Sequence, residues 1–453
     1  MNDLTVGKPF SVIWRFSLPL LLSMALQQCY NIADSVIVGQ FTGQAGLAAI
    51  GAAYPITLIY IAIATGASMG CSVVIGQLFG AKRMRDLKTA IYTAIFALLT
   101  LGILLGGAGI ISARGILTLL STPGTTIDDA TAYLAIYAFG IIGNFVYNTA
   151  TAIFTGLGDS KRPLYFLLIS SILNVILDLI AVGPLRMGVA GAAWATAISQ
   201  FVSAIVSVFV LIRKSKAELQ LPEKAPKFSR DILQEMCRFS IPAIIQQCCV
   251  ALSHTILQTL VNSYGETFMA GYEAASKIHN FVYMCFNTIG TAFSTFAAQN
   301  FAAGEKARVR QGVNCSVGII FTFTVLAVLI LQLFPAALMG LFVDPAENTG
   351  VIEVGKQFLR IISPDYLLIC FIIVGGGLLR GVGRVKDFLL VTLLDFAIRI
   401  AMSYLLSLGL LDSYTGMFWA WYFGSVVDLG ILLLLYRRML HGGILDIGKT
   451  RNV

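Results

Sequence analysis

Two aspartates stand in long apolar stretches without a basic residue one helical turn away. Asp34 follows Tyr30 by four positions and Asp178 follows Asn174 by four, so in a helix each carboxylate shares a face with a phenol or an amide. A carboxylate inside a membrane costs about 2.5–3.5 kcal/mol on insertion scales, so an unpaired one is expected to have a function. Such a pair could coordinate Na⁺ through its oxygens. Alternatively, one carboxyl group could hold a proton, because burial and a like charge favour its neutral form.

Further oxygen donors follow one face of a predicted helix. This polar stripe consists of Tyr133, Tyr137, Asn144, Asn148 and Thr151, and a later helix adds Thr196. All of these residues lie in the first half of the chain, as Asp34 and Asp178 do. Asp34 and Asp178, with Tyr30, Asn174, Thr196 and the donors of this stripe, among them Tyr133 and Asn148, could form a cation-coupling site, with Na⁺ as a candidate ligand of Asp34, Asp178, Asn174 and Thr196. For the amides and hydroxyls, a purely structural role in joining helices stays open.

Four other carboxylates lie in apolar stretches of the second half. Asp395 precedes Arg399 by four positions and Glu273 precedes Lys277 by four, so we expect two ion pairs that neutralise charge locally. Asp365 and Asp428 could lie at the membrane interface. The sequence does not decide whether these four residues are functional or structural.

Two further sets of residues are candidates for substrate binding and conformational change. Pro19 lies on the same predicted helix as Asp34 and would kink it, and Pro242 repeats it later in the chain. We expect a substrate cleft to be lined by Asn31, Tyr137, Asn144, Met69, Gln247, Met284 and Asn287.

The composition shows what positions these residues. Of 453 residues, 57% are hydrophobic and 12% charged, whereas a soluble chain has about 25% charged residues. This composition excludes a cytosolic enzyme, a disordered chain and a nucleic-acid module. We expect the chain to be embedded in a lipid bilayer. The three His and eight Cys show no metal or disulfide spacing, so no cofactor is expected. We see no cleaved signal peptide.

Twelve stretches are long and apolar enough to cross a bilayer, which takes about 20 residues. They are 12–38, 48–78, 89–112, 130–155, 163–184, 188–212, 236–261, 268–300, 311–334, 351–378, 388–410 and 416–438. Most of the 31 Lys and Arg fall between alternate stretches, in clusters such as 82–88, 213–230, 306–310 and 437–451. Basic loops face the cytoplasm, so we expect both termini to be cytoplasmic in a multi-pass protein of a bacterial plasma membrane.

The sequence repeats after about 223 residues. Arg15-Phe16-Ser17-Leu18-Pro19 returns as Arg238-Phe239-Ser240-Ile241-Pro242, and two later motifs return in the same order on the basic side. Copies with the same orientation need an even number of helices each, here six. We therefore predict an all-α membrane protein with an N-terminal lobe (1–212), a cytoplasmic linker (213–235) and a C-terminal lobe (236–453). Two parallel lobes with a central cleft are typical of secondary transporters.

Several motifs resemble the MATE (multidrug and toxic compound extrusion) family over nearly the whole chain. They include Asn31-Ile32-Ala33-Asp34-Ser35, Gly76-Gln77-Leu78-Phe79-Gly80-Ala81, Gly156-Leu157-Gly158-Asp159-Ser160 and Asn174-Val175-Ile176-Leu177-Asp178. The resemblance implies two pseudo-symmetric lobes in a V and export of amphipathic, often cationic compounds by H⁺ or Na⁺ antiport. It further implies a monomer and, in the DinF-like branch, a cation site in the N-terminal lobe. The NorM-like branch has a carboxylate on the seventh helix, and here none lies between Glu235 and Glu266.

Other functions remain as alternatives. A flippase or exporter for lipid-linked glycans or other metabolites would be expected to line its cavity with arginine, for which Lys277, Arg360 and Arg399 are the candidates. A sugar–proton symporter would place an Asp before the Arg in the loop near Arg83. An intramembrane prenyl transferase would need Asp clusters that bind Mg²⁺. A passive channel has less use for buried carboxylates. The expectation is therefore a transporter rather than an enzyme.

Overall fold

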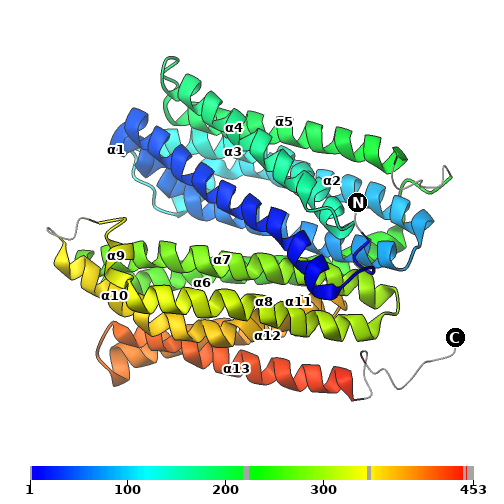
Figure 1. Cartoon of the computed structure of the whole chain (residues 1–453). Helices are drawn as coiled ribbons and strands as arrows, with labels where there is room; N and C mark the ends of the chain where they lie inside the picture. The colour runs from blue at the N-terminus through cyan, green and yellow to red at the C-terminus, as the bar shows by residue number, and fades with distance from the viewer. Residues whose placement is uncertain (1–2, 218–223, 344–347, 442–444, 446–453) are drawn as a thin grey trace. The chain divides into compact units, whose positions relative to one another are not determined.

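The computed structural model describes residues 3–217, 224–343, 348–441 and 445, and this part of the chain is built from helices (Figure 1). Twelve of the described helical segments are long and apolar enough to cross a membrane, as predicted. The elements are α1 (Pro9–Gly80), α2 (Met84–Leu119), α3 (Ile127–Gly156), α4 (Lys161–Val182), α5 (Gly188–Ala217), α6 (Arg230–Ser263), α7 (Glu266–Ala302), α8 (Lys306–Leu333), α9 (Pro335–Met339), α10 (Thr349–Ile362), η1 (Ser363–Asp365), α11 (Tyr366–Gly381), α12 (Val385–Tyr404), η2 (Leu405–Leu410) and α13 (Thr415–Leu440).

The first, second and tenth predicted spans have local features that the sequence pattern did not show. The first two spans form one continuous element, α1, which is kinked at Gly43 with φ 66° and ψ −162°. Only glycine adopts such a backbone conformation without strain. The tenth span is broken into α10 and α11 by the short 3₁₀ turn η1. Pro364 lies in this turn, and it has no N–H to donate to a regular helix.

The chain packs into two compact units whose boundaries lie inside helices. The first unit comprises Leu18–Cys248 together with Asp3, and the second comprises Leu4–Ser17 and the described residues from Cys249 onward. The boundaries therefore fall within α1 and α6 and not in the predicted linker, of which residues 218–223 lie outside the described part. The predicted lobes follow the sequence repeat, whereas these units follow packing, so the lobe boundaries stay a prediction.

Specific contacts explain where the units divide. In the second unit, Trp14 near the start of α1 lies 5.9 Å from the Phe323 ring of α8, centroid to centroid. In the first unit, Ser240 Oγ of α6 donates to the Ala67 carbonyl of α1 at 2.8 Å. Gly70 permits this approach, because a Cβ there would lie 2.2 Å from Ser240 Oγ. The start of α1 and the start of α6 thus belong to different units.

The core of the first unit is built around α3, which packs against α2 and α5. Gly140 and Gly143 of α3 face α5, and a Cβ on them would lie 2.9 Å from Ala197 and 3.0 Å from the Phe201 nitrogen. Small residues at such positions let the helix backbones approach closely. This tight packing holds the polar stripe of α3 against α5.

The core of the second unit is aromatic. Phe286, Phe293 and Phe296 of α7 are completely or almost completely buried, as are Phe358 of α10 and Phe418 of α13. The α7 and α11 backbones approach where a Cβ on Gly377 would lie 2.7 Å from the Gly290 carbonyl oxygen. These contacts place α7 at the centre of the second unit.

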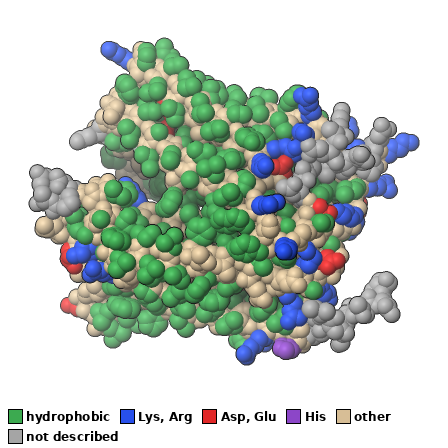
Figure 2. All heavy atoms as spheres, in the orientation of Figure 1, with side chains coloured by type: hydrophobic (Ala, Val, Ile, Leu, Met, Phe, Trp, Pro, Cys, Tyr) green, Lys and Arg blue, Asp and Glu red, His purple; other side chains and the backbone are tan. Residues whose placement is uncertain are grey.

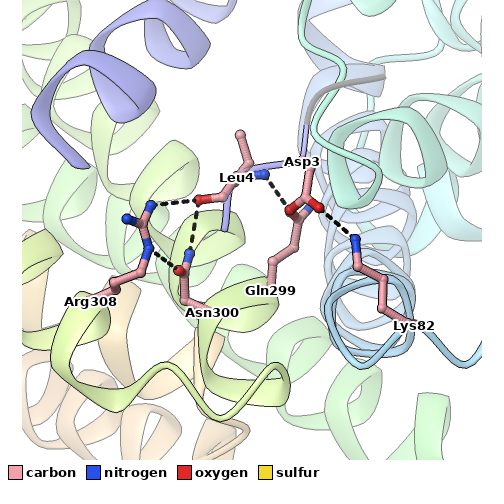
Figure 3. Close-up of polar contacts among 6 residues, drawn as sticks. All are labelled: Asp3, Leu4, Lys82, Gln299, Asn300 and Arg308. Atoms are coloured by element: carbon pink, nitrogen blue, oxygen red, sulfur yellow. Dashed lines mark hydrogen bonds and ion pairs between the residues drawn. The ribbon is translucent and has the colours of Figure 1, made fainter. Parts of the chain in front are cut away.

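Two amide side chains at the end of α7, Gln299 and Asn300, bind the N-terminal segment (Figure 3). In the second unit, Leu4 N donates to Gln299 Oε1 at 3.0 Å, and Asn300 Nδ2 donates to the Leu4 carbonyl at 3.2 Å. In the first unit, Asp3 forms an ion pair with Lys82. The buried amides of α7 thus satisfy backbone groups of the segment that precedes α1.

The surface fits a lipid environment. On the face shown in Figure 2, hydrophobic side chains cover the middle of the helices, and Lys and Arg gather toward one end. Large apolar side chains such as Leu104, Ile111 and Ile205 are more than half exposed. Such a surface would associate in water, so the chain is a multi-pass membrane protein.

Candidate functional site

The Asp34 and Asp178 side chains, which come from α1 and α4, interact directly in the first unit. Asp178 is completely buried, whereas Asp34 is partly buried. Asp178 Oδ1 has no hydrogen-bond donor among the described residues. Two carboxylates in contact repel each other unless they share a proton or a cation. The arrangement therefore has a place for one positive charge.

Asn174 and Thr196 continue the site from α4 to α5. The Asn174 amide has one orientation in which both its nitrogen and its oxygen have hydrogen-bond partners. In this orientation the nitrogen donates to Asp178 Oδ2 at 2.7 Å, and the oxygen accepts from the Thr196 backbone N at 3.2 Å. The four-residue spacing of Asn174 and Asp178 places both on one face of α4, as predicted. A hydrogen bond to the ionised carboxylate favours its charged form, so Asn174 opposes the effect of burial.

Amides of α3 extend the polar region further. Asn148 Nδ2 donates to Asn144 Oδ1 at 2.8 Å, and Asn144 Nδ2 donates to Gln200 Oε1 of α5 at 3.2 Å. A cavity of about 10 Å³ lies beside them, and its polar lining comes from Tyr137, Asn144, Thr196 and Gln200. This is about the size needed for one water molecule. The cavity can hold one small polar species between α3 and α5.

The tyrosines complete the first-unit site. Tyr30 of α1 interacts electrostatically with both aspartates, and Tyr133 does so from α3. The Tyr133 and Tyr137 rings are stacked with centroids 6.1 Å apart. Phenol hydroxyls can donate to a carboxylate or accept a cation through oxygen. The predicted coupling residues thus lie together in one unit, on α1, α3, α4 and α5.

The carboxylates of the second unit have a different environment. Asp395 accepts two hydrogen bonds from Arg399 Nη2, at 2.8 and 2.7 Å. The Arg399 guanidinium lies 4.0 Å from the centroid of the Trp421 ring. Asp365 and Asp428, for which an interfacial position was open, are buried, and Ser425 Oγ donates to Asp365 at 2.9 Å. The predicted Asp395–Arg399 pair is therefore confirmed.

The other predicted ion pair does not form. Glu273 and Lys277 are both exposed, and among the described residues no ion pair joins them. The Lys277 ammonium instead lies 6.0 Å from the centroid of the Phe342 ring. Exposed ion pairs are worth little in free energy, so spacing alone does not hold two long side chains together.

Comparison with known proteins identifies the family. The MatE family model matches the chain twice, over residues 19–180 and 242–405. The chain belongs to the MatE family. The two matches begin 223 residues apart, the offset of the sequence repeat.

Relatives of this MatE protein are transporters rather than enzymes. The "Probable multidrug resistance protein YoeA" of Bacillus subtilis (strain 168) is 29% identical over 367 residues, covering 79% of this chain and 78% of the relative. The "Multidrug export protein MepA" of Staphylococcus aureus (strain N315) is 22% identical over 430 residues, covering 94% and 93%. A solved structure, the outward-facing conformation of a multidrug resistance MATE family transporter of the MOP superfamily, has TM-score 0.88 at 22% identity and covers 96% of each chain. That likeness shows the fold.

The candidate substrate residues of this MatE protein are divided between the two units. Tyr137 and Asn144 line the small cavity of the first unit. Asn31 is exposed, and Met69 and Gln247 are partly buried, in the same unit. Met284 and Asn287 lie on α7 in the second unit, where Asn287 Nδ2 donates to the Tyr283 carbonyl at 3.3 Å. Their shared role in a cleft stays a prediction.

Pro19 lies inside α1, next to the position where this helix passes from the second unit to the first, between Ser17 and Leu18. A proline inside a helix leaves one backbone carbonyl without its usual donor and weakens the helix locally. The helix that carries Asp34 therefore has a weak point at the unit boundary, which agrees with the predicted conformational role but does not test it.

The sequence reasoning missed two residues of these MatE polar clusters. Gln200 binds Asn144 and lines the small cavity, and it could have been found because it follows Thr196 by four positions on α5. Trp421 stacks on Arg399 from another helix, α13. No spacing signal along the chain connects residues 399 and 421, so only the fold could reveal this contact.

Proposed function

We propose that this chain exports amphipathic, mainly cationic small molecules from the cytoplasm in exchange for H⁺ or Na⁺. Asp34 and Asp178 bind the coupling ion in the first unit, Asn174 and Thr196 orient the carboxylates, and Tyr30 and Tyr133 supply hydroxyls. The relatives named as multidrug resistance and export proteins support a drug-like cargo. No cofactor is needed, because the membrane gradient supplies the free energy.

One observation carries this proposal. Two carboxylates from different helices interact directly, and the more buried of them has an oxygen without a donor in the described part of the chain. A structural acid would be expected to have a basic partner, as Asp395 has in Arg399. The Asp34–Asp178 pair instead has hydroxyl and amide neighbours, which suit a small cation that arrives and leaves.

The proposed cycle uses this pair as an exchange site. Binding of one ion from outside reduces the negative charge of the Asp34–Asp178 pair, which weakens the attraction for a cationic substrate, and the substrate is released. The loaded carrier returns and releases its ion inside, and the recovered negative charge attracts the next substrate. Exchange of one monovalent cationic substrate for one H⁺ or Na⁺ moves no net charge, so the concentration gradient of the ion drives it. A membrane potential adds about 2.3 kcal/mol per 100 mV only for each additional charge moved.

The test is efflux of a fluorescent cation such as ethidium from vesicles containing the purified protein. A pH gradient and a Na⁺ gradient are imposed separately, so that the coupling ion is identified by the gradient that drives efflux. We expect Asp34→Asn to insert normally and to lose gradient-driven efflux to the level of empty vesicles. The neutral amide keeps the shape of the carboxyl group but cannot exchange a cation.

Asp129→Asn is the matched control, since Asp129 is an exposed carboxylate at the start of α3 in the same unit. It should transport like the wild type. Undiminished gradient-driven efflux by Asp34→Asn would overturn the proposed site, and absence of efflux under both gradients in the wild type would overturn antiport of this cargo.

A second cargo class, anionic metabolites, has one relative in its favour. The "FAD transporter" of Shewanella oneidensis (strain ATCC 700550 / JCM 31522 / CIP 106686 / LMG 19005 / NCIMB 14063 / MR-1) is 24% identical over 343 residues, covering 74% of this chain and 75% of the relative. An anionic cargo needs available positive charge, whereas Arg399 is already bound to Asp395. FAD added as a competitor in the vesicle assay distinguishes the two classes, because a cation exporter should ignore it.

We place the protein in a bacterial plasma membrane with both termini in the cytoplasm. The support is the positive charge at the basic ends of the helices, such as Arg437 and Arg438 in the last turn of α13. A reporter that fluoresces only in the cytoplasm, fused after Val453, should be bright. A dark fusion that is still expressed would reverse the orientation.

A further inference from the structure

The second unit contains an apolar cavity that the proposed transport mechanism does not use. Its volume is about 320 Å³, and it lies between α8, α11 and α13. We call it the α8–α11–α13 groove. Its walls include Val313, Val317, Val374, Gly375, Leu429 and Leu432, and the polar lining residues are Asn314 and Tyr436. A groove this apolar inside a bilayer is suited to hydrocarbon.

Close helix contacts fix the position of α11 beside the groove. Gly376 faces Phe388 of α12 and Gly377 faces Gly290 of α7, with Cβ positions 2.5 and 2.7 Å from their nearest atoms. These close contacts hold α11 toward α7 and α12. Gly375 lines the groove on the α13 side, and a Cβ there would lie 3.1 Å from Leu432 Cδ1, so glycine is what fits at this position.

At the corresponding positions of the first unit, the described residues are closely packed. Ala90 and Ala94 of α2 precede Val313 and Val317 by the repeat offset, and both alanines are completely buried. Val313 and Val317 are larger but only partly buried. The groove is therefore a property of the second unit and not a general consequence of the repeated fold.

The groove can be entered from outside the unit. Phe371 on α11 is 41% exposed and Leu433 on α13 is 51% exposed, and both line it. For a membrane protein, the molecules available to such an opening include the surrounding lipids.

One end of the groove is basic. Arg310 precedes Val313 and Asn314 by three and four positions, so it lies on the same face of α8, one turn nearer the helix start. Arg437 follows Leu433 by four positions on α13, in the last turn of that helix. The groove thus joins an apolar interior to two arginines where the helices end.

We propose that the α8–α11–α13 groove binds an anionic phospholipid, with one acyl chain in the apolar cavity and the phosphate at Arg310 and Arg437. An apolar body with a negative charge at one end matches the groove in both polarity and charge. Basic pockets between transmembrane helices are suited to anionic head groups. Tyr436, which lines the groove next to Arg437, is an amphipathic side chain of the kind enriched at membrane interfaces.

The experiment measures retained lipid on the detergent-purified full chain by native mass spectrometry. Phosphatidylglycerol and phosphatidylcholine with the same acyl chains are added in turn. We expect the wild type to retain phosphatidylglycerol preferentially. The double variant Arg310→Gln/Arg437→Gln should lose about tenfold in phosphatidylglycerol retention while retaining phosphatidylcholine unchanged, because only the charge contacts are removed.

A second variant tests the apolar part. Val313→Phe reduces the space in the groove and should lower retention of both lipids. The control for this variant is Leu326→Phe, at an exposed position of the same helix that does not line the groove. Arg85→Gln, an exposed arginine of α2 in the first unit, is the control for charge removal. Both controls should bind lipid like the wild type, and thermal unfolding of each variant checks that it is folded.

Two results would overturn the proposal. One is unchanged phosphatidylglycerol preference in a folded Arg310→Gln/Arg437→Gln variant. The other is lipid retention unaffected by Val313→Phe. Competition identifies another occupant: glycerophosphoglycerol, which has the head group without acyl chains, should not displace the lipid, and displacement by it or by ethidium would assign the groove to a soluble anion or to the transported cargo.

Discussion

Asp178 of the first unit and the partly buried Asp395 of the second are held in opposite ways. In the first unit, Asp34 and Asp178 interact directly and have hydroxyl and amide neighbours. In the second unit, Asp395 is held by both of its oxygens to Arg399, which in turn stacks on Trp421. A carboxylate that is already neutralised by a guanidinium has no need of a mobile ion. At these two positions the described part of the chain thus has a carboxylate pair without an ion-pair partner in one copy and an Asp–Arg ion pair in the other.

The central helices of the two units also differ. The central helix of the first unit, α3, is continuous and carries the polar stripe. Its counterpart in the second unit is broken into α10 and α11 at Ser363–Asp365, and an aromatic core surrounds it. The first unit combines a regular scaffold with a polar interior, whereas the second combines an interrupted helix with dense apolar packing.

The strongest test of this comparison uses the same substitution in both units. Asp178→Asn should abolish gradient-driven efflux and leave the melting temperature unchanged or raised, because it removes a buried charge that has no basic partner. Asp395→Asn should instead lower the melting temperature, because it leaves the Arg399 charge buried without its partner. Efflux in vesicles and thermal unfolding in detergent measure the two effects, and the comparison fails if Asp178→Asn is the destabilising one.

Replacing Arg399 tests whether the Asp395–Arg399 ion pair stabilises the second unit. Arg399→Gln leaves Asp395 mostly buried and unpaired, and breaking a buried ion pair in this way costs about 3–5 kcal/mol. We expect a lower melting temperature, with partial recovery in Asp395→Asn/Arg399→Gln. A double variant no more stable than the single one would mean that the stacking on Trp421, and not the ion pair, accounts for the loss.

Pro19 tests whether the weak point of α1 matters for transport. Pro19→Ala restores a helical hydrogen bond, and alanine is more favourable than proline in a helix interior by about 3 kcal/mol. We expect higher thermal stability together with slower efflux, because a more regular α1 bends less readily. Pro55→Ala, in the second span of α1, is the control and should keep its transport rate. Equal rates in both variants and the wild type would remove Pro19 from the mechanism.

The smallest expected effect is at the small cavity of the first unit. Thr196→Val keeps the side-chain shape and removes the hydroxyl that faces Asn174. Loss of one hydrogen bond is worth about 1 kcal/mol, so the concentration of coupling ion for half-maximal efflux should rise about fivefold. Thr196→Ser should behave like the wild type. If Thr196→Val behaves like the wild type and Thr196→Ser does not, the threonine methyl group and not its hydroxyl is what matters.

Much of the fold could be predicted from the sequence, because membrane spans follow from length and apolarity alone. The repeat at Arg15 and Arg238 gave the duplication, and the family match begins at positions with the same offset. The unit boundaries inside α1 and α6 could not be predicted, since hydropathy says nothing about which neighbour a helix end packs against. Pro364 indicated the break at Ser363–Asp365. The residues around it are apolar without interruption, however, so hydropathy predicted one span.

The candidate site was predictable where its residues share a helix. Asn174 with Asp178 and Asp395 with Arg399 follow from a spacing of four, and both pairs interact in the structure. The same spacing failed for Glu273 and Lys277, which are exposed to competing solvent. The contact between Asp34 and Asp178 depends on tertiary packing. The sequence could suggest it only because both are aspartates in apolar stretches, where acidic residues are rare.

The small cavity beside Thr196 also has a consequence for ionic selectivity. At about 10 Å³ it has room for a single water or one bare ion. A cavity that admits one water also admits a bare sodium or potassium ion, so its size does not separate the two. An ion reaching this depth must exchange its hydration shell for side-chain oxygens, because the close contacts at Gly140 and Gly143 hold α3 and α5 too near each other for a hydrated ion. The tightness of that helix pair would then make loss of hydration water the step that selects among cations.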